Sequence, residues 1–335
     1  MAEKILIIQT AFPGDVILTL PMLQVLKREM PDSVIDFLCI PKTAEIAEGN
    51  PLINERIIYD KKNSGLNGFS EMVKKLRRSK YDILISPHRS FRSTLISFFS
   101  GAKKTISFDT SAMSFMYETR VKYEKDIHEI LRNISLLKPL GIIEENIIRP
   151  ELFIHSGIKE KISDYLIEKN LKTGDKFICI APGSVWFTKR YPKEKFTEVC
   201  DLLAVKNIKI FLTGGPADKY ISEYIIKKSV NKNIIDATGE FTFKESAELI
   251  KRAELLLTND SAPLHLANAV GTKVLAIFGA TIPAFGFYPY GKEDIVFEIN
   301  GLKCRPCSIH GGNQCPVKTF DCMERINPKA ISENI

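Results

Sequence analysis

Residues 255–278, LLLTNDSAPLHLANAVGTKVLAIF, decide the fold of this chain. Leu255–Thr258 is an apolar run of strand length, and the polar turn Asn259–Pro263 leads into a short helical stretch that ends before Gly271. Lys273–Phe278 is a second apolar run. A strand, a turn, a helix and a second strand in this order predict an α/β fold in which helices cover a parallel sheet.

The same alternation occupies the rest of the chain in two arrays. In the C-terminal half we expect further strands at Lys176–Ala181, Ile208–Thr213 and Ile234–Ala237, helices at Lys193–Lys206, at about 217–228 and at Phe243–Arg252, and Lys273–Phe278 as the last strand. In the N-terminal half we expect strands at Lys4–Gln9, Val34–Cys39 and Tyr81–Ser86, and a helix at Asp15–Met30. A polar stretch near His155–Lys161 is expected to start a linker helix, which divides the chain into domains 1–157 and 158–335.

Two such arrays predict two Rossmann-like domains that face each other across a central cleft, with ligands at the carboxyl ends of the strands. Loops directly after strands are therefore the candidates for chemistry. The sequence has no Gly-x-Gly-x-x-Gly motif. Gly286–Lys292 has the spacing of a Walker phosphate loop, but Glu293 stands where the metal-binding Ser or Thr is needed, so a nucleoside-triphosphate site is excluded there.

The composition is that of a globular protein of 335 residues, 44% hydrophobic and 26% charged. This length provides for two domains with separate cores. The apolar run Ile5–Ile8 is too short for a signal peptide, and the apolar-rich residues 16–26 are interrupted by polar ones, far short of a membrane span. We therefore expect a cytoplasmic protein.

Positive charge is concentrated in one stretch of the N-terminal half. Residues 61–104 hold eleven Lys and Arg but only two acids, Glu71 and Asp82, a local excess of +9 in a chain whose net charge is +7. One interpretation is a solvated helix face at Glu71–Lys80. The other is attraction to an anionic partner, namely a phosphorylated glycolipid, a membrane surface or nucleic acid. No nucleic-acid-binding module accompanies the stretch, which ranks nucleic acid last.

The seven cysteines fall into two groups. Cys39, Cys179 and Cys200 lie in apolar patterns typical of buried thiols. The other four, together with His310, cluster near the C-terminus: Cys304, Cys307, Cys315 and Cys322. Four ligands would suffice for zinc, but only Cys304 and Cys307 have the spacing of a ligand loop, so reduced thiols are favoured over a structural metal.

The loop after the first strand ends in Gly14 and Asp15. Asp15 at the start of a helix has an ordinary structural explanation, because Asp is a common helix cap. A carboxylate at this strand end can also accept the proton of a substrate hydroxyl, and the helix N-terminus would keep it ionised. Both interpretations use the same position.

The second candidate loop lies in the C-terminal half and favours an anion site. In Asn259–Ala267, Asp260 and Ser261 lie where a strand ends and a helix begins, Ala262 leaves room for a phosphate, and His265 follows one turn later. Asp260 would be costly beside a phosphate, so we expect it to meet amides, hydroxyls or a sugar.

The third and fourth loops add further polar side chains. In Ala181–Pro192, Ser184 can donate to a phosphate oxygen and Lys189 can neutralise a departing diphosphate. In Ser86–Ser93, Arg89 and Arg92 have helical spacing and could clamp a carboxylate or phosphate, although solvated surface arginines explain them equally well.

Taken together, these loops resemble those of family 9 glycosyltransferases, the ADP-heptose:lipopolysaccharide heptosyltransferases. The matching segments, in order along nearly the whole chain, are Ile8–Pro21, Arg89–Ser93, Ala181–Pro192, Thr213–Gly215 and Thr258–Thr281. Asn259–Ala267 is the most specific, followed by Gly14-Asp15-Val16. The Pro-Gly-Ser and Ser-Phe-Arg-Ser strings are closer to the second heptosyltransferase than to the first.

The resemblance implies a GT-B fold and an inverting transfer, without metal or other cofactor, from ADP-L-glycero-D-manno-heptose to the Kdo/heptose–lipid A inner core. It implies that Asp15 is the general base and Lys189 a second catalytic residue. The remaining roles it implies are donor binding by Ser184, Lys189, Phe241, Asp260, Ser261, Ala262 and His265, and acceptor binding by Thr10, Arg89 and Arg92. Its partners would be the nucleotide-sugar donor, an anionic lipid-linked acceptor and the inner face of the inner membrane.

Two alternatives of the same fold stay open, a transferase that uses another nucleoside-diphosphate sugar and a sugar-nucleotide epimerase. An epimerase would need no lipid acceptor, and the basic stretch 61–104 argues mildly against it.

Overall fold

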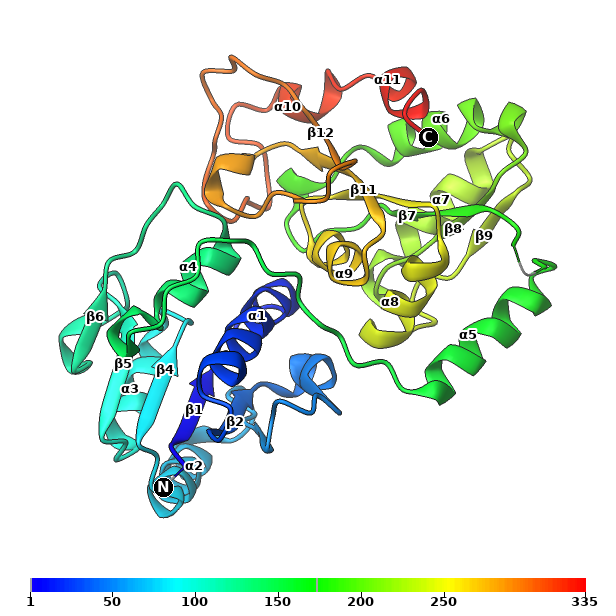
Figure 1. Cartoon of the computed structure of the whole chain (residues 1–335). Coiled ribbons are helices and arrows are strands. Elements are labelled where there is room, and N and C mark those ends of the chain that lie inside the picture. The colour runs from blue at the N-terminus through cyan, green and yellow to red at the C-terminus, as the bar shows by residue number, and fades with distance from the viewer. Residues whose placement is uncertain (1, 173) are drawn as a thin grey trace. The chain divides into compact units, whose positions relative to one another are not determined.

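The computed structural model describes residues 2–172 and 174–335 and divides into two compact units, 1–153 and 154–335 (Figure 1). The boundary lies four residues before the one expected from the sequence. It falls just ahead of helix α5 (Ser156–Glu168), so the whole linker helix belongs to the C-terminal unit. Among the described residues, no helix is both long enough and apolar enough to cross a membrane.

The N-terminal unit contains a parallel six-stranded sheet of order β3-β2-β1-β4-β5-β6. Its strands are β1 (Lys4–Ile8), β2 (Val34–Cys39), β3 (Glu55–Ile58), β4 (Ile83–Ser86), β5 (Lys104–Phe108) and β6 (Thr119–Val121). Its helices are α1 (Pro13–Glu29), α2 (Gly65–Ser79), α3 (Phe91–Phe99) and α4 (Glu129–Ser135), with short 3-10 turns η1 (Pro41–Ala47), η2 (Ser114–Met116) and η3 (Lys138–Leu140).

Helices cover both faces of this sheet. Leu6 and Ile8 of β1 pack with Met72 and Leu76 of α2, in a cluster that also holds Ile96 of α3. Because side chains alternate along a strand, the neighbours of Leu6 and Ile8 point to the opposite face, where α1 and α4 pack together. The two covered faces explain why the central strands β1 and β4 are apolar except at one end, at Lys4 and Ser86.

The C-terminal unit repeats the architecture with a parallel sheet of order β12-β11-β10-β7-β8-β9. Its strands are β7 (Phe177–Ala181), β8 (Lys209–Leu212), β9 (Ile234–Asp236), β10 (Leu255–Asn259), β11 (Lys273–Phe278) and β12 (Ile295–Glu298). After α5 come α6 (Lys193–Leu202), α7 (Lys219–Lys228), α8 (Phe243–Arg252), α9 (Ala262–Val270), α10 (Asp321–Glu324) and α11 (Pro328–Ser332). The C-terminal helix α11 returns to pack on α6 (Figure 1).

The predicted α/β fold with two parallel sheets is confirmed, but two expectations about the C-terminal elements are wrong. Lys273–Phe278 is not the last strand, because β12 adds to its outer side. β12 carries the short apolar run Ile295–Phe297, but it lies at the edge of the sheet and all four of its residues are only half-buried. The helix expected at Lys193–Lys206 ends at Leu202, and residues 204–206 form a 3-10 turn.

Candidate functional sites

At the carboxyl edge of the C-terminal sheet, Asn259 holds the loop that follows β7. This fully buried residue ends β10 beside β7. Its side-chain amide donates to the carbonyl oxygens of Pro182 (2.8 Å) and Gly183 (3.3 Å), and its Oδ1 accepts from the Tyr191 N–H (2.9 Å). Both ends of loop 182–192 are thereby tied to β10.

This attachment brings Lys189 to Asp260. Lys189 Nζ lies 2.6 Å from Asp260 Oδ2, and the side chains are 14% and 7% exposed. The Thr281 hydroxyl donates to the same oxygen (2.7 Å). We expected Asp260 to meet amides, hydroxyls or a sugar, and the hydroxyl is present. The lysine partner was not foreseen, and it neutralises a carboxylate that would otherwise oppose an anion at this edge.

The C-terminal cysteine segment supports the Lys189 loop from outside the sheet. The Thr188 N–H donates to the Gly312 carbonyl (3.0 Å), and the Gly312 N–H donates to Thr188 Oγ1 (2.7 Å). At Gly311, where φ is +87°, a Cβ atom would lie 3.0 Å from Lys189 Cγ. The close approach and the left-handed backbone together require glycine here. No pattern in the sequence links this segment to Lys189.

The start of α9 offers the Ala262 N–H beside the same pair, because Pro263 has no N–H and the Leu264 N–H donates to the Ser261 carbonyl (3.1 Å). Ser261 is the N-cap in an extended conformation, and its side chain makes no capping hydrogen bond, while Ala262 begins the helix. Ser184 is buried, and its carbonyl accepts from Arg190 Nε (2.6 Å). His265 is only 5% exposed and lies edge-on to Phe287 at 6.3 Å between ring centroids. The structure thus gathers Lys189, Asp260, Ser261 and Ala262 at the ends of β7 and β10.

Arg190 and Phe241 have different surroundings. Arg190 is held by the Ser184 carbonyl and by the Tyr220 hydroxyl (2.6 Å), which makes it a structural element of the loop. Phe241 follows β9, at the edge of the sheet, and its ring packs on Tyr165 of α5 with centroids 4.8 Å apart. Its side chain therefore faces α5, and only its backbone is left for a ligand at the strand ends.

In the N-terminal unit, the loops after β1 and β4 meet through hydrogen bonds. Thr10 Oγ1 lies 2.8 Å from His88 Nδ1, and Ser93 Oγ lies 3.2 Å from the same nitrogen. Lys61 Nζ donates to the Thr10 carbonyl (2.8 Å). Burial, with the positive charges of Lys61 and Arg89, lowers the pKa of His88 from 6.5 to about 4. His88 is therefore neutral at pH 7 and serves the network as a hydrogen-bonding group.

His88 predicts a pH dependence of stability. The pKa of His88 in the folded state lies below its value of 6.5 in the unfolded chain. Between pH 6.5 and about 4 the unfolded chain therefore binds a proton that the folded chain does not bind, so the free energy of unfolding decreases as the pH falls through this range. The loss from this group is about 3 kcal/mol at most. Between pH 7 and 4, the melting temperature should fall more steeply with decreasing pH for the native protein than for His88→Asn. The asparagine keeps a hydrogen-bond acceptor near the position of Nδ1. Parallel curves would contradict the assignment.

Asp15 lies at the third position of α1, and Asp15 Oδ2 accepts from the Phe12 N–H (3.1 Å). Asp15 therefore caps the helix from its third position, and α1 begins two residues before the expected start at Asp15. A second carboxyl, missed in the sequence, lies nearby: Glu129 at the start of α4 forms an ion pair with Arg132. Burial raises the pKa of Glu129 to about 7, Arg132 opposes the rise, and the charge of Asp15 adds to it. Only the i,i+3 spacing of Glu129 and Arg132 could have signalled this pair.

Tyr123 links these acids to Arg89. The Arg89 guanidinium lies 4.1 Å from the centroid of the Tyr123 ring, and that of Arg132 lies 4.6 Å from it. Burial raises the pKa of Tyr123, and both Glu129 and Asp15 contribute to the rise. Arg92 is separate from this cluster, because it is exposed and donates to the Lys61 carbonyl. Asp15, Arg89 and Glu129 therefore form one polar cluster, and Arg92 lies outside it.

All seven cysteines are free thiols, and Cys39, Cys179 and Cys200 are buried as predicted. Burial and the neighbouring cysteines of the C-terminal cluster raise the pKa of Cys322 to about 11. Within residues 2–172 and 174–335, no group of three or more His, Cys, Asp or Glu side chains is arranged to hold a metal ion.

Comparisons with known proteins agree on one family. The family profile described as "Glycosyltransferase family 9 (heptosyltransferase)" matches residues 69–317. The chain is 30% identical to lipopolysaccharide heptosyltransferase 3 of Escherichia coli strain K12 over 312 residues, 88% of either chain. It is also similar to the crystal structure of a family 9 glycosyltransferase from Veillonella parvula (TM-score 0.87, 25% identity, 99% of this chain and 96% of that one). The E. coli ADP-heptose heptosyltransferase II structure matches with a TM-score of 0.81 at 20% identity, covering 99% and 97%.

Proposed function

Because the chain belongs to glycosyltransferase family 9, the heptosyltransferases of lipopolysaccharide core biosynthesis, we propose that it transfers heptose from ADP-L-glycero-D-manno-heptose to the Kdo/heptose–lipid A inner core. The observation that carries the proposal is the buried Lys189–Asp260 pair beside the start of α9. It provides a positioned cation beside a helix N-terminus, which suits a diphosphate.

The donor occupies the carboxyl edge of the C-terminal sheet in this proposal. Its diphosphate is held by Lys189, Ser184 and the Ala262 N–H at the start of α9, where the alanine side chain adds little bulk. Asp260 keeps Lys189 extended toward the edge before the donor arrives, and the Thr281 hydroxyl remains on the carboxylate when Lys189 turns to the phosphates. His265 lines the part of the site that holds the sugar of the donor, and the backbone of Phe241 lines the part that holds its adenine.

The acceptor occupies the carboxyl edge of the N-terminal sheet. Asp15 removes the proton from the attacking hydroxyl, and Thr10, Arg89 and Arg92 bind the anionic sugar. As the bond to the donor breaks, positive charge develops on the heptose ring and negative charge on the leaving diphosphate. Lys189 and the N-terminus of α9 act where that negative charge appears, which is where electrostatic stabilisation contributes most. No metal or other cofactor takes part in the proposed transfer.

The subtype is a question about the acceptor. The family resemblance favours the second heptosyltransferase, whereas the E. coli relative at 30% identity is a heptosyltransferase 3. We propose an inner-core acceptor that already carries heptose. Acceptors with no heptose, one heptose or two heptoses therefore distinguish the subtypes.

The test is an incubation of the full chain with ADP-heptose and each of these Kdo-bearing lipid A acceptors, read by mass spectrometry. We expect one acceptor to gain one heptosyl group, with no gain when ADP-glucose or a UDP-sugar replaces the donor. Transfer from another nucleotide sugar alone would overturn the donor assignment. Conversion of the nucleotide sugar without any acceptor would identify an epimerase instead.

A further inference from the structure

Helix α3 exposes three phenylalanines, whereas its buried side is mostly Ser and Thr, with Ile96 in the core. Phe91, Phe98 and Phe99 are 53%, 52% and 39% exposed, whereas Ser93 and Ser97 are buried. The exposed rings recur at helical spacing along one side of the helix. A helix that faces water normally shows the reverse distribution, so this side of α3 is built for a partner other than water.

Neighbouring elements extend the same surface. Phe69 of α2 contacts Phe99 edge-on, with ring centroids 6.4 Å apart, and Leu66 in the first turn of α2 is 87% exposed. On the other side, η2 packs beside α3 and exposes Phe115 to 71%. We define the α3 face by its seven exposed or half-exposed apolar side chains, namely Leu66, Phe69, Phe91, Phe98, Phe99, Met113 and Phe115.

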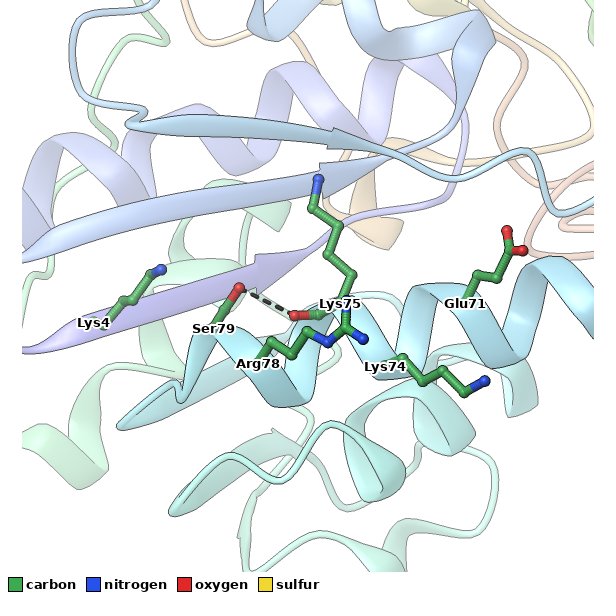
Figure 2. A pocket seen from close by; sticks show the side chains of 6 residues that line it. All are labelled: Lys4, Glu71, Lys74, Lys75, Arg78 and Ser79. Atoms are coloured by element: carbon green, nitrogen blue, oxygen red, sulfur yellow. Dashed lines mark hydrogen bonds between the residues drawn. The ribbon is translucent and has the colours of Figure 1, made fainter.

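Cations border the α3 face along α2. Arg77 Nε donates to the Phe99 carbonyl (2.9 Å), which fixes one guanidinium beside the rings. Lys74 and Arg78 lie on the outer side of α2 and line an open hollow of about 720 Å³ at the amino end of β1. Figure 2 shows this hollow, whose remaining lining residues are Lys4, Glu71, Lys75 and Ser79.

Little of this charge is neutralised by the protein itself. Lys75 pairs with Glu55, but in the described parts of the chain no carboxylate lies within ion-pair distance of Lys74, Arg77 or Arg78. Glu71 is the only acid on α2. The α3 face is therefore an aromatic surface with a cationic border.

We propose that the α3 face docks on an anionic phospholipid bilayer, with the aromatic rings at the lipid interface and the α2 cations among the headgroups. A second copy of this chain does not suit the face, because it would bring the same cations against themselves. The proposal rests on the proposed function in one respect, that the acceptor is lipid-linked. Arg92 lies beside Phe91 on α3, so docking would bring an acceptor-binding residue to the bilayer surface.

The docking test uses the full chain without any donor or acceptor. Co-sedimentation with phosphatidylcholine vesicles should show no binding, whereas vesicles that also contain phosphatidylglycerol should bind the protein, less so at high salt. Leu66→Ser with Phe98→Ser should lower the partition coefficient about tenfold or more. Lys74→Glu with Arg78→Glu should lower the partition coefficient on the anionic vesicles by a similar factor.

Matched controls lie elsewhere on the chain. Ile143→Ser with Val205→Ser removes two side chains of comparable exposure, 69% and 89%, and Lys227→Glu with Lys228→Glu reverses two exposed charges of α7. Both control pairs should bind like the native protein, and melting temperatures check that every variant is folded. Equal losses in the test and control pairs would overturn the proposal.

Other outcomes are equally decisive. A dimer in solution that Leu66→Ser with Phe98→Ser dissociates would assign the face to self-association, and binding of an oligonucleotide in preference to anionic vesicles would assign it to nucleic acid. Transfer to a deacylated, soluble acceptor separates this inference from the proposed function. The Leu66→Ser, Phe98→Ser variant should retain that transfer, while failure of the native protein to transfer would refute the function and leave the vesicle result standing.

Discussion

Asp15→Asn is expected to reduce heptosyl transfer by about a thousandfold or more, while the affinity for ADP-heptose stays unchanged. The asparagine Oδ1 can still accept the hydrogen bond from the Phe12 N–H, so the start of α1 should be preserved and only the basic carboxylate is lost. Initial rates with the reactive acceptor measure the first effect, and calorimetric titration with ADP-heptose measures the second.

Two comparisons make this prediction sharp. Asp15→Ala should lose transfer to the same extent but also melt earlier, because it removes the cap, which contributes about 1 kcal/mol. Asp32→Asn changes an exposed acid just after the same helix and should behave like the native enzyme. Retained transfer in Asp15→Asn would reduce Asp15 to a helix cap. Loss of donor binding would move it to the donor site.

Lys189→Met is expected to lower kcat/KM about a hundredfold or more and to weaken donor binding, because the leaving diphosphate loses its cation. It should also destabilise the protein by about 3 kcal/mol, since Asp260, 7% exposed, keeps its charge without a counterion. Steady-state kinetics, donor titration and thermal melting report the three effects separately.

The double variant Lys189→Met with Asp260→Asn distinguishes catalysis from stability. Neutralising Asp260 removes the unpaired buried charge, and the asparagine can still accept from the Thr281 hydroxyl. Melting should therefore recover toward the native value, while transfer stays low. Recovery of transfer together with stability would show that Lys189 matters only as the counterion of Asp260.

The elements that could be predicted from the sequence are those whose local pattern matches their burial. β2 and α8 have the expected bounds, Val34–Cys39 and Phe243–Arg252. An apolar run interrupted only by Asp36 marks β2, and a capping box starting at Thr242 marks α8. β3, β5, β6 and β12 were missed. β3, β6 and β12 lie at the edges of the sheets and are short and largely half-buried. β3, β5 and β6 also mix charged or polar residues with apolar ones, so no clear period marks them.

The polar strand ends were equally accessible to sequence reasoning. Asp15 after β1 and Asp260 after β10 could be selected, because a parallel sheet places every strand end at one edge. The residues that interact with them could not be predicted from the sequence. Lys189 lies seventy-one residues before Asp260, yet the two form an ion pair. Glu129 lies more than a hundred residues from Asp15, yet the charge of Asp15 helps to raise its pKa.

By itself, therefore, the sequence determined the two parallel α/β arrays, the loops that carry polar chemistry and the resemblance to glycosyltransferase family 9. Hydrophobic periodicity and turn residues act locally, so they can be read along the chain. The tertiary structure alone decided that Lys189 neutralises Asp260, that Gly311 lies against Lys189 and that α3 turns its phenylalanines outward. Ion pairing, close packing and burial depend on which distant segments the sheet brings together, and no local pattern encodes that.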